Sequence, residues 1–514
     1  MREAASPILV GCARLTVRDG ERLPSPPSPQ GLMVAAEWRA LADSGAAPAR
    51  LVPHLDTVAA IRTFADSAPQ FATPFGRCDN YPAHVARALG ARPRRCLYPV
   101  VGGNTPQWLV NLLAEEIRTG RSEMALIVAA EAMRTAARAS QDGRLLDWQE
   151  AGLQPPEVIG DPRPGVSPHE LRHGLGDPPA TYALFETARA AHLGRPMARH
   201  LETVGALWAR FSEAAAQDAM AALPVARSAR EIVTIGAENR LVAWPYTKLM
   251  CANMFVDQSA AVLLTSTHVA RALGIDERRW IWLAGSADID DKWYVSERVD
   301  YHSAPAIGIG ARAALDQAGV DIADIDAFDL YSCFPVAVAL AADALGLALD
   351  DPRGLTLTGG LTFYGGPGNG YALHAIAAMM EHLRARPGGR GLISGNGWYL
   401  TKHSFGVYQS APPAEPWVRS DPASLQAMVD GLPSPVVRSD AEGTGRIEAF
   451  TVPCARDGTM RAIVIGRLDS DGSRFLANAA DADLAFCKRL MAEESIGRPV
   501  HLRQVQGRGI VTLP

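Results

Sequence analysis

The stretch CLYPVVGGN at residues 96–104 carries the pattern on which the fold prediction rests. Its first six residues are typical of a buried strand, and two glycines then lead into a segment whose apolar residues recur at helical spacing as far as Ile117. Thr119 and Gly120 end that segment, and the apolar run MALIVAA at residues 124–130 is a second strand. A strand, a glycine-rich turn, a helix and another strand together predict one α/β unit.

The same order of elements returns in the second half of the chain. The turn GGPGNG at residues 365–370 opens a helix-like segment, RPGG at 386–389 ends it, and GLISG at 391–395 is the next strand. Two such units predict a tandem of related α/β halves, with parallel strands that helices cover on both faces. The alternative is coincidence, because unrelated α/β proteins also contain single units of this kind.

The composition of the chain divides it into parts. We predict an N-terminal half at residues 1–285, which includes an inserted lobe at about 138–230, and a second half at 286–410. A proline-rich linker follows at 411–438. Short β runs separated by turns then fill residues 439–514, and five short strands of this size fit a small OB-like β-barrel.

The bulk composition excludes several classes of protein. A hydrophobic fraction of 48% and a charged fraction of 20% are typical of a soluble globular protein. The net charge is only −5 and no block of Lys and Arg occurs, so no nucleic-acid partner is expected. No run approaches the roughly 18 apolar residues that cross a bilayer, so no membrane contact is expected. The amino terminus lacks the pattern of a secretory signal, and we expect a cytoplasmic location.

Cofactor and metal motifs are missing from the sequence. The seven cysteines are scattered without a CxxC pair, so we predict neither a disulfide framework nor a metal site. Walker, GxSxG, HExxH and dinucleotide fingerprints are absent, and no bound cofactor is predicted. In the two glycine-rich turns, backbone amides at a helix N-terminus can face developing negative charge. The predicted substrate-binding residues there are Gly103, Asn104, Gly366 and Asn369, although turn formation alone explains the two asparagines equally well.

Several segments resemble the thiolase superfamily, in an order and spacing that agree over roughly residues 5–410. The turn, helix and strand at 102–133 resemble the thiolase nucleophile helix and the strand after it. Residues 251–261 resemble the segment around the Asp-Gly of thiolases. DLYSCF at 329–334 stands at the place of the Asn-Glu-Ala-Phe or His-Asp-Cys-Phe motif. Residues 358–360 stand at the place of Asn-Gly-Gly, and residues 365–367 at the place of Gly-His-Pro. The resemblance implies the duplicated thiolase fold, an α/β architecture of five layers in the order αβαβα. The extra barrel resembles that of thiolase-like proteins related to the sterol-carrier-protein thiolases.

Every chemical group of the thiolase pattern is replaced in this sequence. The resemblance places Gly103 at the position of the nucleophilic cysteine and Gly366 at the position of the histidine in Gly-His-Pro. Tyr331 stands where the family orients a catalytic water with Asn or His, and the second cysteine aligns with Ile393 or Ser394. An acyl-enzyme thioester requires a thiolate, which glycine does not offer, so conventional thiolysis is not expected.

Four polar side chains near the matched motifs are candidate catalytic residues. Tyr331 and Tyr364 lie beside the motifs, and a tyrosine acts as an acid, a base or an oxyanion donor where its environment suits. His374 lies on the predicted second-half helix, and His403 follows the last predicted core strand, next to Lys402. For each residue the alternative is structural, either a core tyrosine with a satisfied hydroxyl group or a hydrogen-bonded histidine.

The resemblance implies an acyl-CoA thioester as substrate, with coenzyme A as part of that substrate. The first hypothesis is an atypical acyltransferase-class enzyme that forms or cleaves a C–C bond without a nucleophilic cysteine. The second is a retro-aldol lyase on β-hydroxyacyl-CoA, because oxyanion donors and one acid–base group suffice for it and cysteine-free relatives with an OB-fold partner are associated with such cleavage. The third is a non-catalytic acyl-CoA-binding protein. Thiolases commonly dimerise, so a homodimer is one assembly to be tested.

Overall fold

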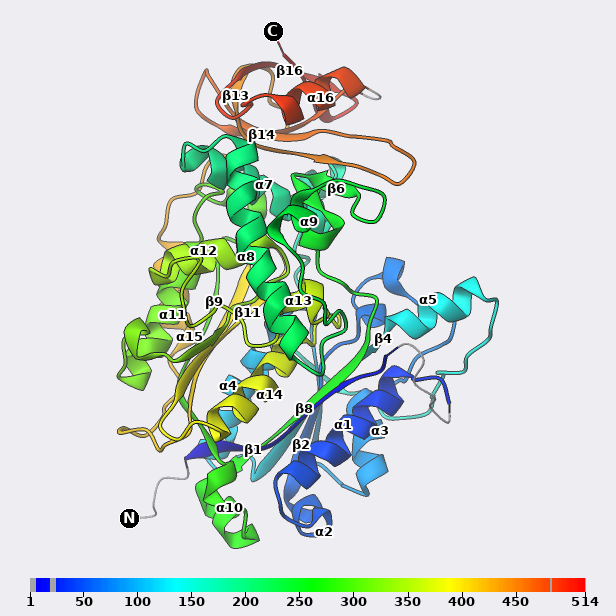
Figure 1. Cartoon of the computed structure of the whole chain (residues 1–514), viewed down its shortest axis with the longest axis vertical. Coiled ribbons are helices and arrows are strands. Elements are labelled where there is room, and N and C mark those ends of the chain that lie inside the picture. Colours follow the sequence, from blue (N-terminus) through cyan, green and yellow to red (C-terminus); the bar gives the residue numbers. More distant parts are fainter. Residues whose placement is uncertain (1–5, 19–24, 481–482, 514) are drawn as a thin grey trace.

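The computed structural model describes residues 6–18, 25–480 and 483–513 of the chain (Figure 1). Within these ranges the central feature is a mixed sheet in the strand order β10-β11-β12-β9-β1-β8-β4-β2-β3-β5. Its strands are β1 (Pro7–Thr16), β2 (Leu55–Ala60), β3 (Arg95–Pro99), β4 (Met124–Ala132), β5 (Glu157–Ile159), β8 (Asp257–Ser266), β9 (Ile281–Asp290), β10 (Ala327–Asp329), β11 (Arg390–Gly397) and β12 (Lys402–Gln409).

The sheet consists of two sub-sheets, the first made of β1, β8, β4, β2, β3 and β5 and the second of β10, β11, β12 and β9. β1 of the first sub-sheet pairs with β9 of the second at two positions, Ile8 and Leu9. Between the sub-sheets lie α4 (Thr105–Arg118) and α14 (Tyr371–Arg384), which contact strands of both halves. These two helices are buried around most of their circumference because strands lie on both sides of them. They form the middle layer of the molecule.

Further helices cover the outer faces of the two sub-sheets. α1 (Pro29–Asp43) and α3 (Tyr81–Leu89) pack on the first sub-sheet, and α11 (Pro305–Ala318), beside α12 (Pro335–Leu345), packs on the second (Figure 1). The resulting sequence of layers is helix, sheet, helix, sheet, helix. The predicted five-layered αβαβα architecture is therefore confirmed.

The apolar run in β4 shows how the sequence specifies these layers. Side chains alternate between the two faces of a strand. Leu126 and Val128 accordingly pack under the outer helices, whereas Ala125 and Ile127 pack against the middle layer. Both faces of β4 are buried, which explains why its sequence is continuously apolar rather than alternating.

The inserted lobe is largely helical and lies between the layered core and the C-terminal part of the chain (Figure 1). Its long helices are α7 (Pro178–His192) and α8 (Met197–Gln217). α7 packs against α12 of the core and against β13 (Gly443–Pro453) of the C-terminal part, so it connects the two. The remaining helices of the chain are α2 (Pro48–Leu51), α5 (Met133–Gln141), α6 (Pro168–Arg172), α9 (Ala229–Val233), α10 (Thr267–Leu273), α13 (Gly360–Phe363), α15 (Pro422–Asp430) and α16 (Leu484–Ala492).

The C-terminal strands form a closed barrel, as predicted. Their order is β14-β15-β17-β16-β13, and an additional pairing of β14 with β13 closes the ring. α16 lies in the chain between β15 and β16, and β6 and β7, which follow the lobe in the chain, extend the barrel sheet beyond β13. The strands not yet placed are β6 (Leu241–Trp244), β7 (Tyr246–Thr247), β14 (Ile463–Leu468), β15 (Arg474–Ala479), β16 (Pro499–Val505) and β17 (Arg508–Thr512).

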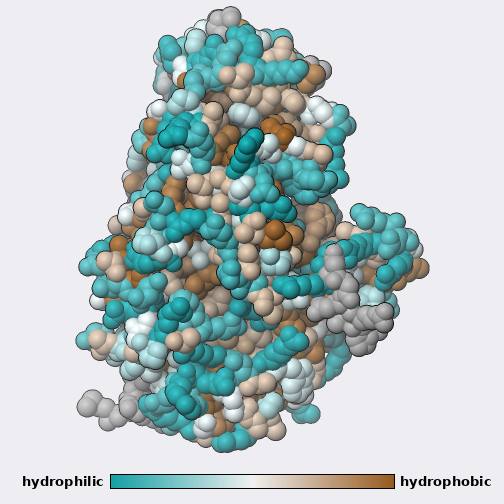
Figure 2. All heavy atoms as spheres, in the orientation of Figure 1, coloured by the Kyte–Doolittle hydropathy of each residue, from teal (hydrophilic) through white to brown (hydrophobic). Residues whose placement is uncertain are grey.

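The surface is mostly polar on the face drawn in Figure 2, where hydrophobic residues are scattered among hydrophilic ones. In the described part of the chain, every helix is too short or too polar to cross a membrane.

Candidate functional site

The first glycine-rich turn leaves no room for a side chain at residue 103. A Cβ atom built on Gly103 would lie 2.1 Å from the Tyr331 hydroxyl oxygen and 2.5 Å from the main-chain carbonyl oxygen of Asn396. Ordinary van der Waals contact requires about 3.5 Å or more. The phenol of Tyr331 therefore occupies the space that a nucleophilic side chain at residue 103 would need.

Two contacts hold Tyr331 in this position, one through its main chain and one through its ring. It follows β10, and its main-chain N–H donates to Ser394 Oγ over 2.9 Å. Its ring meets the Tyr371 ring edge-on, with 5.6 Å between the ring centres. Tyr371 in turn donates through its hydroxyl to the buried Asp329 carboxylate at 2.8 Å. Burial raises the pKa of Tyr331 above its ordinary value, so the phenol is neutral near pH 7 and is a hydrogen-bond donor.

His403 faces the same small cavity as Tyr331. The cavity has a volume of about 10 Å³ and is also lined by Ser394 and Asn396, which is about the room that one water needs. The Nε2 atom of His403 lies 3.0 Å from the Leu400 carbonyl oxygen. Because a carbonyl only accepts, Nε2 carries the proton and Nδ1 keeps its lone pair. Burial lowers the pKa of His403 to about 4, so the imidazole is neutral at pH 7.

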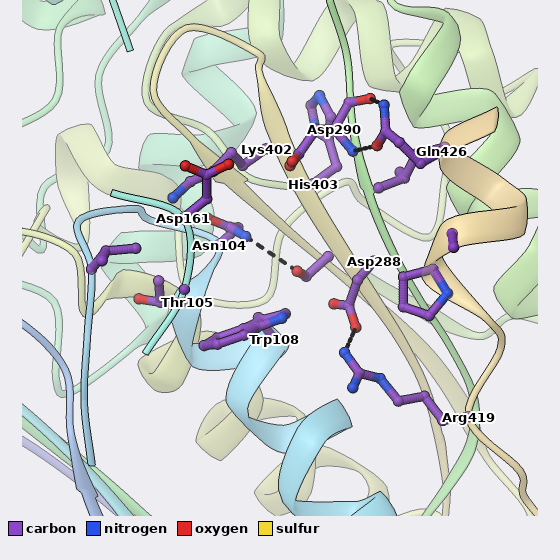
Figure 3. A pocket seen from close by; sticks show the side chains of 16 residues that line it. Asn104, Thr105, Trp108, Asp161, Asp288, Asp290, Lys402, His403, Arg419 and Gln426 are labelled. Atoms are coloured by element: carbon purple, nitrogen blue, oxygen red, sulfur yellow. Dashed lines mark hydrogen bonds and ion pairs between the residues drawn. The ribbon is translucent and has the colours of Figure 1, made fainter. Parts of the chain in front are cut away.

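His403 also lines a larger pocket of about 360 Å³ at the N-terminal end of α4 (Figure 3). Asn104 donates from its amide to Ser404 Oγ at 3.3 Å inside this pocket, and Arg419 pairs with Asp288 at 2.7 Å. The other polar residues of the lining are Thr105, Asp161, Asp290, Lys402 and Gln426. The larger pocket thus begins at the predicted turn and reaches the histidine of the small cavity.

Lys402 is the buried cation of this pocket. Its ammonium donates to the Val101 carbonyl oxygen at 2.7 Å, next to the glycine turn. Burial lowers the pKa of Lys402, and the nearby Asp290, which is its cross-strand neighbour, opposes that shift. The sequence pattern pointed to Lys402 only as a neighbour of His403, whereas the structure places its amine beside Gly102.

Tyr364 and His374 form a second, separate pair. The Tyr364 hydroxyl lies 2.8 Å from His374 Nδ1, and both side chains are fully buried. Burial lowers the pKa of His374 to about 3, so the imidazole is neutral. The Arg14 guanidinium lies over the Tyr364 ring, and it forms ion pairs with Asp218 and Glu381. Among the described residues this pair lines neither the small cavity nor the larger pocket.

The predicted substrate-binding residues divide in the same way. Asn369 accepts the Gly102 N–H on its amide oxygen at 3.1 Å and donates to the Arg62 carbonyl at 2.9 Å, so it ties the two glycine-rich turns together. Gly366 donates its N–H to the Asn253 carbonyl at 2.8 Å, and a Cβ there would meet its nearest neighbours at 3.5 Å. Unlike residue 103, residue 366 has room for a side chain.

A loop that was not predicted from the sequence closes the small cavity. Trp398 and Leu400 have left-handed backbones, with φ of 55° and 57°, a strained conformation that is rare for such side chains. The hydroxyl of Tyr182 from α7 holds this loop, since it donates to the Trp398 carbonyl at 3.0 Å and accepts the Leu400 N–H at 3.3 Å. The inserted lobe therefore reaches the site through Tyr182.

Cys333 does not replace the missing nucleophile. Burial raises the pKa of its thiol to about 12, so the thiolate is scarce at pH 7. Its sulfur lies 3.9 Å from the amide nitrogen of Asn396. The reactive groups available at the cavity are therefore a phenol and an imidazole rather than a thiolate.

Comparisons with known proteins agree with this fold. The family model for the additional C-terminal domain of thiolase-like protein type 1 matches residues 424–506, and a search of curated proteins found no match. An acetyl-CoA acetyltransferase from Syntrophomonas wolfei (16% identity, 80% of this chain and all of that one, TM-score 0.55) and an Ltp2–ChsH2(DUF35) aldolase (18%, 79% and 98%, TM-score 0.59) share the fold. A monomeric SCP2-thiolase-like protein type 1 from Mycobacterium smegmatis is 36% identical over the whole of both chains, with a TM-score of 0.85. The chain therefore belongs to the SCP2-thiolase-like protein type 1 family.

Proposed function

We propose that this chain cleaves or forms a C–C bond in acyl-CoA thioesters by aldol-type acid–base chemistry, with Tyr331 and His403 as its catalytic residues. The observation that carries the proposal is the Tyr331 hydroxyl, which lies where a side chain of residue 103 would otherwise be. Acyl transfer through a cysteine thioester is not expected at this cavity, because Gly103 has no side chain and burial keeps the Cys333 thiol protonated. Aldol chemistry needs no nucleophilic cysteine.

The protonation states of the two residues suit the cleavage direction. The neutral imidazole of His403 takes the proton of the β-hydroxyl group through Nδ1. The bond between the α and β carbons then breaks, a carbonyl product leaves, and the electron pair passes into the thioester as an enolate. The neutral phenol of Tyr331 donates a hydrogen bond to the enolate oxygen. The imidazolium returns its proton to the α carbon, so no proton is gained or lost overall.

The relatives are compatible with this proposal. The Ltp2–ChsH2(DUF35) aldolase shares the fold at 18% identity, and the acetyltransferase from Syntrophomonas wolfei is named for an acyl-CoA substrate.

A second candidate function is acyl-CoA binding without turnover. Its support is the size of the cavity between Tyr331 and His403, about 10 Å³, which is too small for a thioester in the present arrangement. The loop at 397–401 must move before a substrate can reach the two side chains, and a protein that only binds acyl-CoA has no need of that movement.

The deciding experiment incubates the protein with a panel of β-hydroxyacyl-CoA and β-ketoacyl-CoA esters and follows the products by mass spectrometry. We expect a ketone or aldehyde and a shortened acyl-CoA, without consumption of free CoA. Tyr331→Phe should lower kcat by about 100-fold, as the loss of one oxyanion donor does, with substrate binding retained. Tyr408→Phe is the matched control, because Tyr408 is a buried tyrosine whose hydroxyl donates to Gln107 outside the cavity.

Three results would contradict the proposal. Shortening that depends on free CoA would favour the acyltransferase hypothesis. Binding of the esters without turnover of any of them would favour the second candidate. A loss of activity in Tyr364→Phe, with Tyr331→Phe unaffected, would assign the chemistry to the other tyrosine–histidine pair.

A further inference from the structure

A cluster of three ligating side chains lies on the first half of the chain, apart from the cavity of Tyr331 and His403. Cys78 precedes α3, His84 lies within α3, and Glu150 comes from the segment after α5. The Cys78 sulfur is 3.6 Å from Glu150 Oε2, and His84 Nδ1 contacts the same oxygen. The three ligand atoms all lie within 4.8 Å of one another. Sulfur, nitrogen and oxygen donors thus converge on one point.

The backbone holds this arrangement without help from a ligand. Cys78 and Glu150 face each other in a parallel β-bridge. The Glu150 N–H donates to the Arg77 carbonyl, and the Asp79 N–H donates to the Glu150 carbonyl, each at 3.0 Å. His84 is fixed by its helix, which Asn80 caps by accepting the Ala83 N–H at 2.9 Å. Ligands set on rigid elements bind a metal with little cost of ordering.

The burial of the three residues suits a site that opens to solvent on one side. Cys78 is 2% exposed, whereas the side chains of His84 and Glu150 are 20% and 17% exposed. An ion between them would have a shielded thiolate below it and a position open to water above. Arg87 binds the other carboxylate oxygen, Oε1, so Oε2 can turn to an ion while Arg87 still orients the carboxylate.

We propose that Cys78, His84 and Glu150 bind a divalent transition metal of the zinc class through Sγ, Nδ1 and Oε2, with water as a fourth ligand. Thiolate, imidazole and carboxylate are the ligands of zinc sites, and a thiolate disfavours magnesium and calcium. The thiolate and carboxylate neutralise the two charges of the ion. Binding releases the thiol proton, and it needs the lone pair of His84 Nδ1. The sequence predicted no metal site, because the spacing 78, 84 and 150 matches no metal motif.

The test uses the full chain, stripped with a chelator and then dialysed against zinc or cobalt. We expect one equivalent of zinc by elemental analysis, a rise in Tm on zinc addition, and a thiolate-to-cobalt charge-transfer band with Co²⁺. Cys78→Ser and His84→Gln should each weaken zinc binding by at least about tenfold. Loss of a group that only hydrogen-bonds to a metal ligand already has an effect of this size, and loss of the ligand itself should have no smaller one. Cys78→Ser should also abolish the cobalt band.

Cys12→Ser is the matched control. The Cys12 sulfur also lies 3.6 Å from a carboxylate, that of Asp43, but no histidine completes that contact among the described residues. This variant should keep both the zinc equivalent and the cobalt band. The proposal fails if the dialysed protein holds no zinc, or if His84→Gln binds zinc as tightly as the native chain. The His84 side chain is partly exposed, so misfolding does not explain a loss of zinc in this variant. A cobalt band that survives in Cys78→Ser would overturn it as well.

Discussion

Replacing Gly103 by alanine tests directly whether Tyr331 fills the place of a nucleophile. The new Cβ would lie 2.1 Å from the Tyr331 hydroxyl oxygen and 2.5 Å from the Asn396 carbonyl oxygen, so both must retreat by more than about 1 Å to reach ordinary contact. Overpacking of a buried site costs about 1–3 kcal/mol. We expect the upper end, about 3 kcal/mol, because one of the two neighbours is backbone in a strand rather than a free side chain.

Gly366→Ala is the matched control, since residue 366 is the other position where the thiolase pattern loses a side chain. Its nearest neighbours would lie 3.5 Å from the new Cβ, and we expect a cost below about 1 kcal/mol. Guanidinium unfolding followed by fluorescence compares the midpoints of the two variants. In the double variant Gly103→Ala with Tyr331→Ala, the costs should fall short of additivity by about 1 kcal/mol or more, because one clash disappears with the phenol. Equal midpoints for the two single variants, or strict additivity in the double variant, would refute the reasoning.

Three further predictions concern the scaffold around the site. Burial lowers the pKa of His173 and His403 to about 4 and that of His374 to about 3, so the unfolded chain binds more protons below about pH 6.5 and each histidine removes about 2 kcal/mol of stability by pH 5. Burial raises the pKa of Glu37 to about 9 and that of Glu131 to about 8, which shifts the total stability in the opposite direction, so NMR titration of the imidazoles is the measurement, and imidazoles that titrate near pH 6.5 would contradict the prediction. Asp329→Ala leaves the Tyr371 hydroxyl and the Leu357 and Thr358 amides without their acceptor. It should therefore lower the free energy of unfolding by at least about 3 kcal/mol. A decrease below about 1 kcal/mol in guanidinium unfolding would count against the anchoring role of Asp329. β5 covers the sheet edge along β3, with Val158 opposite Tyr98. Val158→Pro should free that edge and produce larger species in light scattering, whereas Val158→Thr should not. A Val158→Pro protein of unchanged mass would argue that β5 does not protect the edge.

The elements that the sequence predicted well are those specified by local signals. The helices after residues 104 and 370 follow glycine-rich turns and carry apolar residues at helical spacing, so α4 and α14 begin at those turns. β4 is a run of apolar residues between two such signals. β5, β6 and β7 were not predicted, because strands of two to four residues depend on the neighbour that they pair with rather than on their own sequence.

The site was predictable as a set of residue types but not as an arrangement. Tyr331, Tyr364, His374 and His403 all lie near matched motifs, yet nothing in their spacing indicates that Tyr331 shares a cavity with His403 and that Tyr364 hydrogen-bonds to His374. Such pairings depend on strand register, as when β11 pairs with β12 and brings Asn396 opposite His403. The position of the Lys402 amine was not predictable either, since it donates to the carbonyl of Val101, about 300 residues away in the sequence.

The packing at residue 103 argues that the departures from the thiolase pattern are linked rather than independent losses. A site that had merely lost its cysteine would retain an empty space beside the glycine, whereas here the Tyr331 hydroxyl fills that space. The phenol is positioned by the Ser394 hydroxyl, which accepts the Tyr331 N–H, and by the contact with Tyr371. Ser394 itself is one of the two residues aligned with the second thiolase cysteine. The glycine, the tyrosine and the serine therefore depend on one another, which is the relation expected of a site repacked around a phenol.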